Sequence, residues 1–296
     1  MKKFLAILVA VLMLLSTAAL AEETVTIGYL LSDLSNQFFG TLDAGIKARC
    51  EEKGIKCIGL ESANDAANDM TNMEDLLTQG VDAILYNPVD SDGGQAVVEL
   101  ANQAGVPVIT VDRGVNGGDV VCHIASDNVY GAEIATQYIV DRLGEEGGAI
   151  AEVQGMAGAS AATDRHTGFN NIAEAAENIT IVSSQIGDWD RTKAMNIMEN
   201  VLTSNPEVKG VFCANDVMAL GVVEACQAAG RDDIIIVGFD ADTDAVDAIN
   251  EGTMAATIQQ LPDQMGVTAV DTALAYLNGE TVEPFIGVEV GLVTAE

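Results

Sequence analysis

The segment VTIGYLLSDLSNQFFGTLDAGI, residues 25–46, has the pattern of a strand, a polar turn and the first turns of a helix. Its opening run from Val25 to Leu31 is short, apolar and partly β-branched, which is typical of a buried strand. Ser35-Asn36 then stands where a helix N-cap is expected. The apolar residues beyond the turn recur every three or four positions and predict one core-facing helix stripe: Phe39, Leu42, Ile46 and Cys50.

Phe38 does not belong to that stripe. It falls in the first turn of the predicted helix, beside the carboxyl end of the first strand, and nothing in the pattern buries it. Ligands of open α/β sheets bind at this end of the strands. Two interpretations follow: Phe38 contacts a ligand, or it covers a neighbouring loop.

The strand–helix alternation continues through the rest of the chain, and its strands are almost continuously apolar. This pattern indicates parallel sheets covered by helices on both faces. Roughly ten predicted strands are more than one such sheet usually holds. We therefore predict an α/β fold with two doubly wound parallel-sheet lobes joined by a three-segment hinge.

The expected crossings between the lobes lie at polar or proline-containing breaks. They are Ser126-Asp127, Gln260-Leu261 and a point in the final segment near Val288. The predicted N-terminal lobe comprises residues 23–126 plus 261–288. The predicted C-terminal lobe comprises residues 127–260 plus 289–296.

Residues 1–21 have the three regions of a secretory signal peptide: Lys2-Lys3, an apolar run from Phe4 to Leu15, and the small-residue ending Ala19-Leu20-Ala21. No cysteine follows the apolar run, so we expect no lipoprotein anchor. The mature chain is expected to begin near Glu22, to act outside the cytoplasm and, with about 275 residues, to be long enough for two cores.

The mature chain is strongly acidic. Without Lys2 and Lys3 it has 11 basic residues against 45 acidic ones, a formal charge of −34. Such a chain is repelled by phosphate backbones, so we expect no nucleic-acid partner.

The five cysteines are scattered through apolar runs, and no pair of them has metal-ligand spacing. We interpret them as small buried hydrophobic residues and expect no metal and no cofactor. A Cys50–Cys57 disulfide is compatible with the sequence separation, and this alternative stays open.

Polar residues that suit a ligand stand at the ends of predicted strands. Asp112-Arg113, Asn215-Asp216 and Asp240 each follow directly after one. Helix capping is an adequate alternative for Asp216, but arginine is not a capping residue, and the helix dipole disfavours its charge at a helix start. Arg165 follows a glycine-containing loop, and Trp189, the only tryptophan, follows another strand.

This mixture of side chains suits a sugar. Sugar hydroxyls both donate and accept hydrogen bonds, which matches carboxylates, amides and guanidinium groups. The C–H faces of a sugar match aromatic rings. Enzymatic motifs are missing: the sequence has no G-x-S-x-G, no phosphate-binding G-x-x-x-x-G-K-[ST], and no G-x-G-x-x-G after the first strand. Asp112 and Asp240 have the residue type of a glycosidase acid pair, but tight sugar binding explains them equally well.

The whole mature chain resembles the periplasmic ribose-binding proteins, the sugar-binding components of ATP-binding-cassette importers with the type I periplasmic binding fold. The most specific matching segments are Asn36-Gln37-Phe38-Phe39, Asn87-Pro88-Val89-Asp90-Ser91-Asp92, Val108-Ile109-Thr110-Val111-Asp112-Arg113, His123-Ile124-Ala125-Ser126-Asp127-Asn128, Asn215-Asp216-Val217-Met218-Ala219-Leu220-Gly221, Val237-Gly238-Phe239-Asp240 and Gln259-Gln260-Leu261-Pro262-Asp263-Gln264.

The resemblance implies a set of side chains that hydrogen-bond the sugar: Asn36, Asp112, Arg113, Arg165, Asn215, Asp240 and Gln260. It implies that Phe38 and Phe39 stack on one sugar face. Ribose binders meet the opposite face with a phenylalanine, and this chain has Trp189 there. Tryptophan at this position is familiar from hexose-binding relatives, so a second pentose or a hexose stays open beside D-ribose. Phe239 and Asn87 are further candidates for the pocket. The alternative for Phe239 is a place in the sheet core, and the alternative for Asn87 is a place in a turn.

The implied partners are a monosaccharide and an ATP-binding-cassette permease, with the protein acting as a monomer and not as an enzyme. A chemoreceptor is a further partner that the resemblance leaves open. Effector domains of lac-repressor-type regulators share the implied fold, but they carry an N-terminal helix-turn-helix. A signal peptide occupies that place here, and the charge opposes DNA binding.

Overall fold

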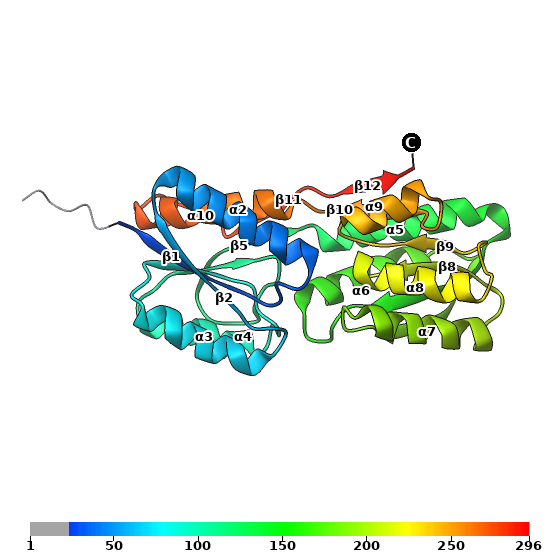
Figure 1. Cartoon of the computed structure of the whole chain (residues 1–296), viewed down its shortest axis with the longest axis horizontal. Helices are drawn as coiled ribbons and strands as arrows, with labels where there is room; N and C mark the ends of the chain where they lie inside the picture. Colours follow the sequence, from blue (N-terminus) through cyan, green and yellow to red (C-terminus); the bar gives the residue numbers. More distant parts are fainter. Residues whose placement is uncertain (1–23, 296) are drawn as a thin grey trace, which may run out of the picture.

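The computed structural model describes residues 24–295, so the predicted signal peptide lies outside the described residues. Two lobes lie side by side along the longest axis of the molecule, and each is built around its own six-stranded sheet (Figure 1). The predicted fold class, two α/β lobes with doubly wound sheets, is confirmed.

The first lobe has a parallel sheet with the strand order β11-β5-β4-β3-β1-β2. Its strands are β1 (Thr26–Leu31), β2 (Lys56–Glu61), β3 (Ala83–Tyr86), β4 (Val108–Val111), β5 (Val120–Ser126) and β11 (Phe285–Val288). Its helices are α2 (Gln37–Lys53), α3 (Ala66–Thr78), α4 (Gly94–Gln103) and α10 (Pro262–Leu277).

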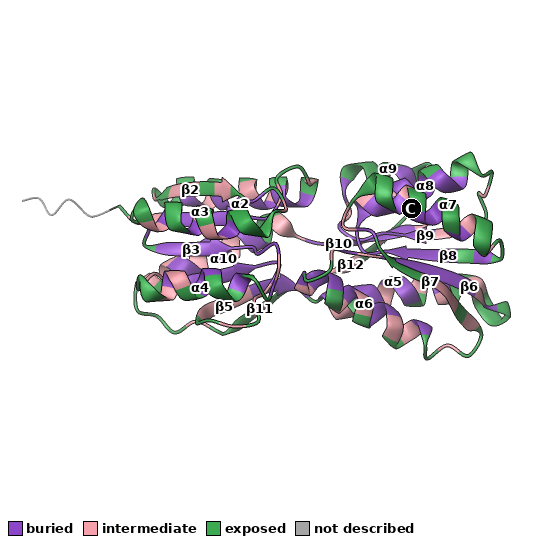
Figure 2. Ribbon diagram, turned by 90° about the horizontal axis from the view of Figure 1, so that it is seen from below, coloured by how far each residue is buried: buried purple, intermediate pink, exposed green. Residues whose placement is uncertain are grey.

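The two faces of this sheet are covered by different helix pairs. Successive side chains of a strand point to opposite faces. Tyr29 and Leu31 of β1 therefore pack with α2 and α10, whereas Leu30 packs with α3 and α4. This two-sided burial is the reason that the strands are apolar without alternation (Figure 2).

The second lobe has the strand order β12-β10-β9-β8-β6-β7. Its strands are β6 (Gly148–Gln154), β7 (Ile179–Ile186), β8 (Val208–Cys213), β9 (Ile235–Val237), β10 (Ala256–Gln259) and β12 (Gly291–Thr294). Its helices are α5 (Asn128–Leu143), α6 (Ser160–Ala173), α7 (Arg191–Ser204), α8 (Asp216–Ala228) and α9 (Thr243–Asn250), with a short 3-10 turn, η1 (Gly144–Glu146), after α5. Helices α5 and α6 cover one face, and α7, α8 and α9 cover the other.

Strand β12 departs from the parallel pattern, because it pairs with β10 in the antiparallel direction. It belongs to the final extended segment, which the structure divides into β11 of the first sheet and β12 of the second. The chain enters the second lobe here from the side of the first lobe and has no crossover helix, so it runs against its neighbour.

The chain passes between the lobes three times. It leaves the first sheet after Ser126 and begins α5 at Asn128; it leaves the second sheet after Gln259 and begins α10 at Pro262. The last passage joins β11 to β12, between Val288 and Gly291. The loops at the carboxyl ends of both sheets therefore face each other across the space between the lobes.

Candidate functional site

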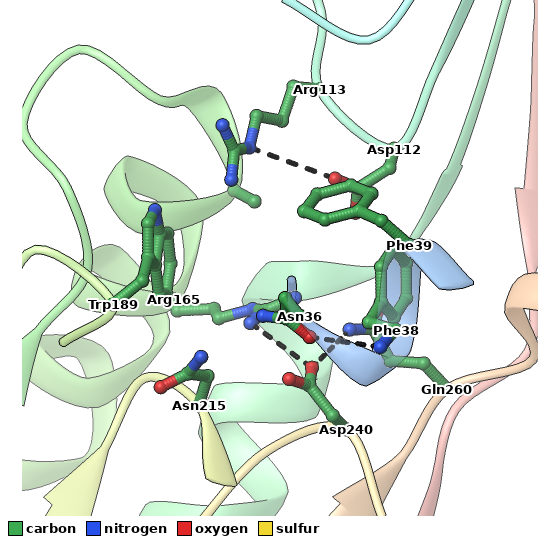
Figure 3. Close-up of a pocket in the computed structure, with 11 residues that line it drawn as sticks. Asn36, Phe38, Phe39, Asp112, Arg113, Arg165, Trp189, Asn215, Asp240 and Gln260 are labelled. Carbon is green, nitrogen blue, oxygen red and sulfur yellow. Dashed lines mark hydrogen bonds and ion pairs between the residues drawn. The ribbon is translucent and has the colours of Figure 1, made fainter. Parts of the chain in front are cut away.

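A cavity of about 280 Å³ lies between the lobes. The first lobe contributes one group of lining residues: Asn36, Phe38, Phe39, Asp112 and Arg113. The second lobe and its junction contribute the other group: Ala161, Arg165, Trp189, Asn215, Asp240 and Gln260. The ten residues singled out from the sequence thus lie around one space (Figure 3). Ala161 was missed, because a small apolar residue carries no chemical signal.

Two asparagines serve both a helix and the cavity. Asn36 is the N-cap of α2, and its Oδ1 accepts the Phe38 N–H at 2.9 Å. Asn215 is the N-cap of α8, and its Oδ1 accepts the Met218 N–H at 3.0 Å. Because each carbonyl oxygen is held by its helix, each asparagine offers its amide N–H₂ group to the cavity. Capping thus fixes these two residues as donors.

Asp112 is held from behind by Asn87. The Nδ2 of Asn87 donates to Asp112 Oδ2 at 3.1 Å and to the Val111 carbonyl at 2.9 Å, and its Oδ1 accepts the Ser32 N–H at 3.2 Å. Asp112 has a φ of 63°, a left-handed conformation that is costly for a residue with a Cβ. Asn87 therefore does not line the cavity; it fixes the carboxylate that does.

Arg165 on α6 is almost completely fixed by its own lobe. Its Nε donates to Asn128 Oδ1 at 2.8 Å, and its Nη1 donates to the Ala214 carbonyl at 2.7 Å and lies 3.6 Å from Asp240 Oδ1. Its Cζ lies 3.8 Å from the centre of the Phe239 ring. Phe239 is thus a core residue that supports the guanidinium group and not part of the cavity wall.

Arg113 is buried but has only long contacts within the protein. Its Nη1 is 3.4 Å from the Pro88 carbonyl, and its Nε is 3.8 Å from Asp112 Oδ2. Its Cζ lies 5.3 Å from the Phe39 ring and 5.7 Å from the Trp189 ring. A guanidinium group has five N–H donors, so Arg113 keeps hydrogen-bonding capacity for a molecule in the cavity.

The aromatic residues line opposite walls. Phe38 and Phe39 form an edge-to-face pair with ring centres 5.1 Å apart, and Trp189 lies across the cavity from them (Figure 3). Trp189 also adopts a left-handed conformation, with φ of 62°. Its ring packs against Gly155, where any Cβ would overlap it. The absence of a side chain at Gly155 makes room for the indole beside the end of β6.

The charges around the cavity balance, because two arginines face two aspartates. Burial lowers the pKa of Arg113 and of Arg165 and raises the pKa of Asp240, since each charge has been removed from water. Gln260 donates from Nε2 to Asp240 Oδ1 at 2.6 Å, but its buried Oε1 has no hydrogen-bond partner among the described residues. The site therefore suits a neutral molecule with many hydroxyl groups.

Other interpretations of the sequence also have an outcome. The five cysteines are all unpaired, so Cys50 and Cys57 form no disulfide in this structure. Four of the five are buried, as small hydrophobic residues are expected to be. Within residues 24–295, no cluster of three or more potential ligand side chains is arranged for a metal ion. No helix in that part of the chain has the length and hydrophobicity needed to cross a membrane.

The fold and the site define a class of protein. Residues 27–281 match the model of the periplasmic binding protein domain, and the chain belongs to this family, whose members bind substrates and are not enzymes.

Within the family, the chain is similar to ribose import binding proteins along its whole length. It is 43% identical to that of Escherichia coli K12 over all of this chain and 99% of the relative. It is 41% identical to that of Bacillus subtilis 168 over 92% of this chain and 88% of the relative. An ABC transporter solute-binding protein of Mycobacterium smegmatis, solved with bound glycerol, superposes with a TM-score of 0.88 at 34% identity and covers 92% of this chain and 94% of its own.

Proposed function

We propose that this protein captures a monosaccharide between its two lobes and delivers it to an ATP-binding-cassette permease, and that D-ribose is its ligand. The observation that carries the proposal is the cavity itself. It is neutral, buried and walled by aromatic rings on two sides, and it offers donors and acceptors from both lobes.

The proposed roles follow from the hydrogen-bonding capacity of each side chain. The amide groups of Asn36 and Asn215 and the guanidinium groups of Arg113 and Arg165 donate to sugar oxygens. Sugar hydroxyls donate to three acceptors: Asp112, Asp240 and Gln260. The rings of Phe38, Phe39 and Trp189 cover the two C–H faces of the sugar.

Ribose is favoured over other sugars by the relatives. Proteins named for ribose import are 41–44% identical to this chain, whereas the D-allose-binding periplasmic protein of Escherichia coli K12 is 31% identical. A binding protein of Actinobacillus succinogenes solved with D-allose superposes with a TM-score of 0.86 at 27% identity, so the fold also accommodates a hexose. Trp189 is the residue that keeps a hexose as the second candidate.

Closure of the lobes on the sugar is part of the proposal. The polar groups are divided between the lobes, so a ligand that contacts both favours the closed state by its differential affinity. We propose that the lobes comprise residues 23–126 plus 261–288 and residues 127–260 plus 289–296, that the signal peptide is cleaved, and that the protein works as a monomer in the periplasm. Presentation of the bound sugar to a chemoreceptor is compatible with the same closed form.

Thermal unfolding of the mature protein with a panel of pentoses and hexoses tests the ligand. A sugar at about 100 times its Kd stabilises the folded state by about 2.7 kcal/mol. We expect D-ribose to give the largest shift, and we expect Arg165→Ala to abolish it. A larger shift with a hexose would assign the site to that hexose. No shift with any sugar, confirmed by calorimetry, would refute sugar binding.

A further inference from the structure

Helix α6, which carries Arg165, has no N-cap in its own lobe. Its N-cap position is Ala159, whose backbone is extended and whose side chain makes no cap hydrogen bond. A side chain of the N-cap residue caps α2, α3, α5, α7 and α8, whereas α4, α9 and α10, like α6, make no such bond. The first N–H groups of a helix have no partner within the helix, so α6 needs an acceptor from elsewhere.

The other lobe supplies that acceptor. The N–H of Ser160, the first residue of α6, donates to the Oγ of Ser91 at 3.2 Å. The N–H of Ser91 in turn donates to the Gly158 carbonyl at 2.9 Å, and the Oγ of Ser160 accepts the Gly114 N–H at 2.9 Å. Three hydrogen bonds therefore join the loops after β3 and β4 to the loop that leads into α6.

These bonds are made by loops that are not part of the three crossings. In the first sheet β4 lies between β3 and the crossing strand β5, and in the second sheet β8 and β9 lie between β6 and the crossing strand β10. A rotation about the crossings therefore moves the two loops apart. Ser91 itself is held in the first lobe, because its carbonyl accepts the Asn116 N–H at 2.9 Å, and its side chain is buried.

The approach of the two loops also requires a glycine. Gly158 has a φ of 88°, and a Cβ there would overlap Oδ2 of Asp90 in the other lobe. Asp90 cannot easily withdraw, since its Oδ1 accepts the Gly93 N–H at 2.6 Å at the start of α4. The two loops are thus in close contact through backbone as well as side chains.

We propose that Ser91 acts as an N-cap for α6 across the cleft, and that Ser91 and Ser160 set the affinity for the ligand without contacting it. When the lobes separate, α6 exchanges this cap for water, and the helix that carries Ala161 and Arg165 loses its attachment to the first lobe. A contact present only in the closed state shifts the open–closed equilibrium by the same amount for every ligand. This inference rests on the proposed capture of a sugar by closure.

The test compares Ser91→Ala and Ser160→Ala with Ser204→Ala, whose hydroxyl bonds the Asn200 carbonyl at 2.7 Å within α7 of a single lobe. Calorimetry and stopped-flow measurements give the Kd and the dissociation rate for the preferred sugar and one weaker sugar. From the usual net worth of one hydrogen bond, we expect each cleft variant to raise both Kd values about two- to tenfold, mostly through faster dissociation. The ratio of the Kd values for the two sugars and the melting temperature of the sugar-free protein should stay at the wild-type values. Ser204→Ala should change none of these quantities.

Wild-type affinity in both Ser91→Ala and Ser160→Ala would overturn the proposal. A changed ratio of the two Kd values would also overturn it, because that result would mean that the cavity itself was altered. If the wild-type protein binds no sugar at all, the proposed function fails instead. In that case the fraction of closed molecules, measured by small-angle scattering without ligand, still decides whether Ser91→Ala opens the cleft.

Discussion

Replacement of Trp189 distinguishes two roles for its indole: stacking on the sugar, or packing only within its own lobe. The Cζ atoms of Arg113 and Arg165 lie 5.7 and 5.8 Å from the centre of the ring, which lies across the cavity from Phe38. Trp189→Ala removes this wall, whereas Trp189→Phe keeps a smaller ring in the same place. Both changes only remove side-chain atoms from the place beside Gly155, so neither forces the backbone to move.

The expected loss follows from the area of the wall. A buried aromatic side chain covers roughly 150–250 Å², and one face of it presents roughly 50 Å² to a sugar. At about 25 cal/mol per Å² this burial is worth about 1.2 kcal/mol. A well-oriented aromatic contact adds about 0.5–1.5 kcal/mol. Trp189→Ala should therefore weaken binding by about 1.7–2.7 kcal/mol, or roughly 20- to 100-fold.

Two measurements check this expectation. Since the chain has a single tryptophan, its emission in the wild-type protein should shift or be quenched as the sugar saturates the site. Calorimetry of the variants then gives the losses in affinity. Trp189→Phe should cost little for ribose if the site holds a pentose, and it should cost more for a hexose if the site holds a hexose. Unchanged emission at saturation, together with wild-type affinity in Trp189→Ala, would refute the stacking role.

Three further predictions concern closure and pH. Small-angle scattering should give a smaller radius of gyration with the preferred sugar than without it, and an unchanged radius would contradict hinge closure. Gly158→Ala should weaken all sugars alike, because its Cβ meets Asp90 only when the lobes close; an unaffected Kd would show that the loops do not approach in solution. Burial, with the nearby Asp242 carboxylate adding to it, raises the pKa of Asp216 from 3.8 to about 8. Between these two pH values the folded state holds a proton that the unfolded chain has released. The resulting contribution to the free energy of unfolding is therefore lost as the pH rises from 3.8 to about 8. The melting temperature should therefore fall less between pH 5 and pH 8 in Asp216→Asn than in the wild type. If the melting temperatures of both proteins fall by the same amount, Asp216 is not the cause of the decline.

Much of the fold follows from local patterns. The apolar runs predicted the central strands well, because both sheets are covered on two faces and a central strand has to be apolar throughout. The edge strands β2, β7 and β12 are more exposed. We placed the crossings at polar breaks because a chain that leaves one apolar core for another has few apolar side chains to bury on the way. Polar side chains there can still be buried, as Ser126 and Gln260 are. The direction of β12 was not predictable, because it depends on where the last passage enters the second sheet.

The residues of the site were predictable to the extent that a core cannot explain them. Arg113, two positions after β4, was conspicuous because neither a core nor a helix cap explains an arginine there, and its contacts within the protein are long. Asn36 shows the limit of such reasoning, because its pattern predicted only a helix cap, and the ligand contact was implied by the resemblance alone. In the structure its Oδ1 caps α2 and its amide faces the cavity. The exposed fraction of Phe38 is only 4%, and its ring belongs to the apolar cluster of the first lobe although it also lines the cavity. No periodicity within one segment reports such contacts with other elements.

The supporting residues were the least visible. Asn128 holds the guanidinium group of Arg165, but in the sequence it was only part of a polar break. Trp189 and Asp112 have positive φ values that non-glycine residues rarely adopt, and such conformations depend on the tertiary structure around them.

The three passages between the lobes have a consequence for how the chain is completed during synthesis. Helix α10, which covers one face of the first sheet beside α2, begins at Pro262, after all the strands of the second lobe except β12. Until that part has left the ribosome, only α2 covers this face of β1, β3 and β4, and β11 is missing from the edge of their sheet. The first lobe to be made therefore stays incomplete until almost all of the second lobe has been made, and such late-arriving contacts slow folding. For a chain that is threaded through a membrane before it folds, this delay is an advantage.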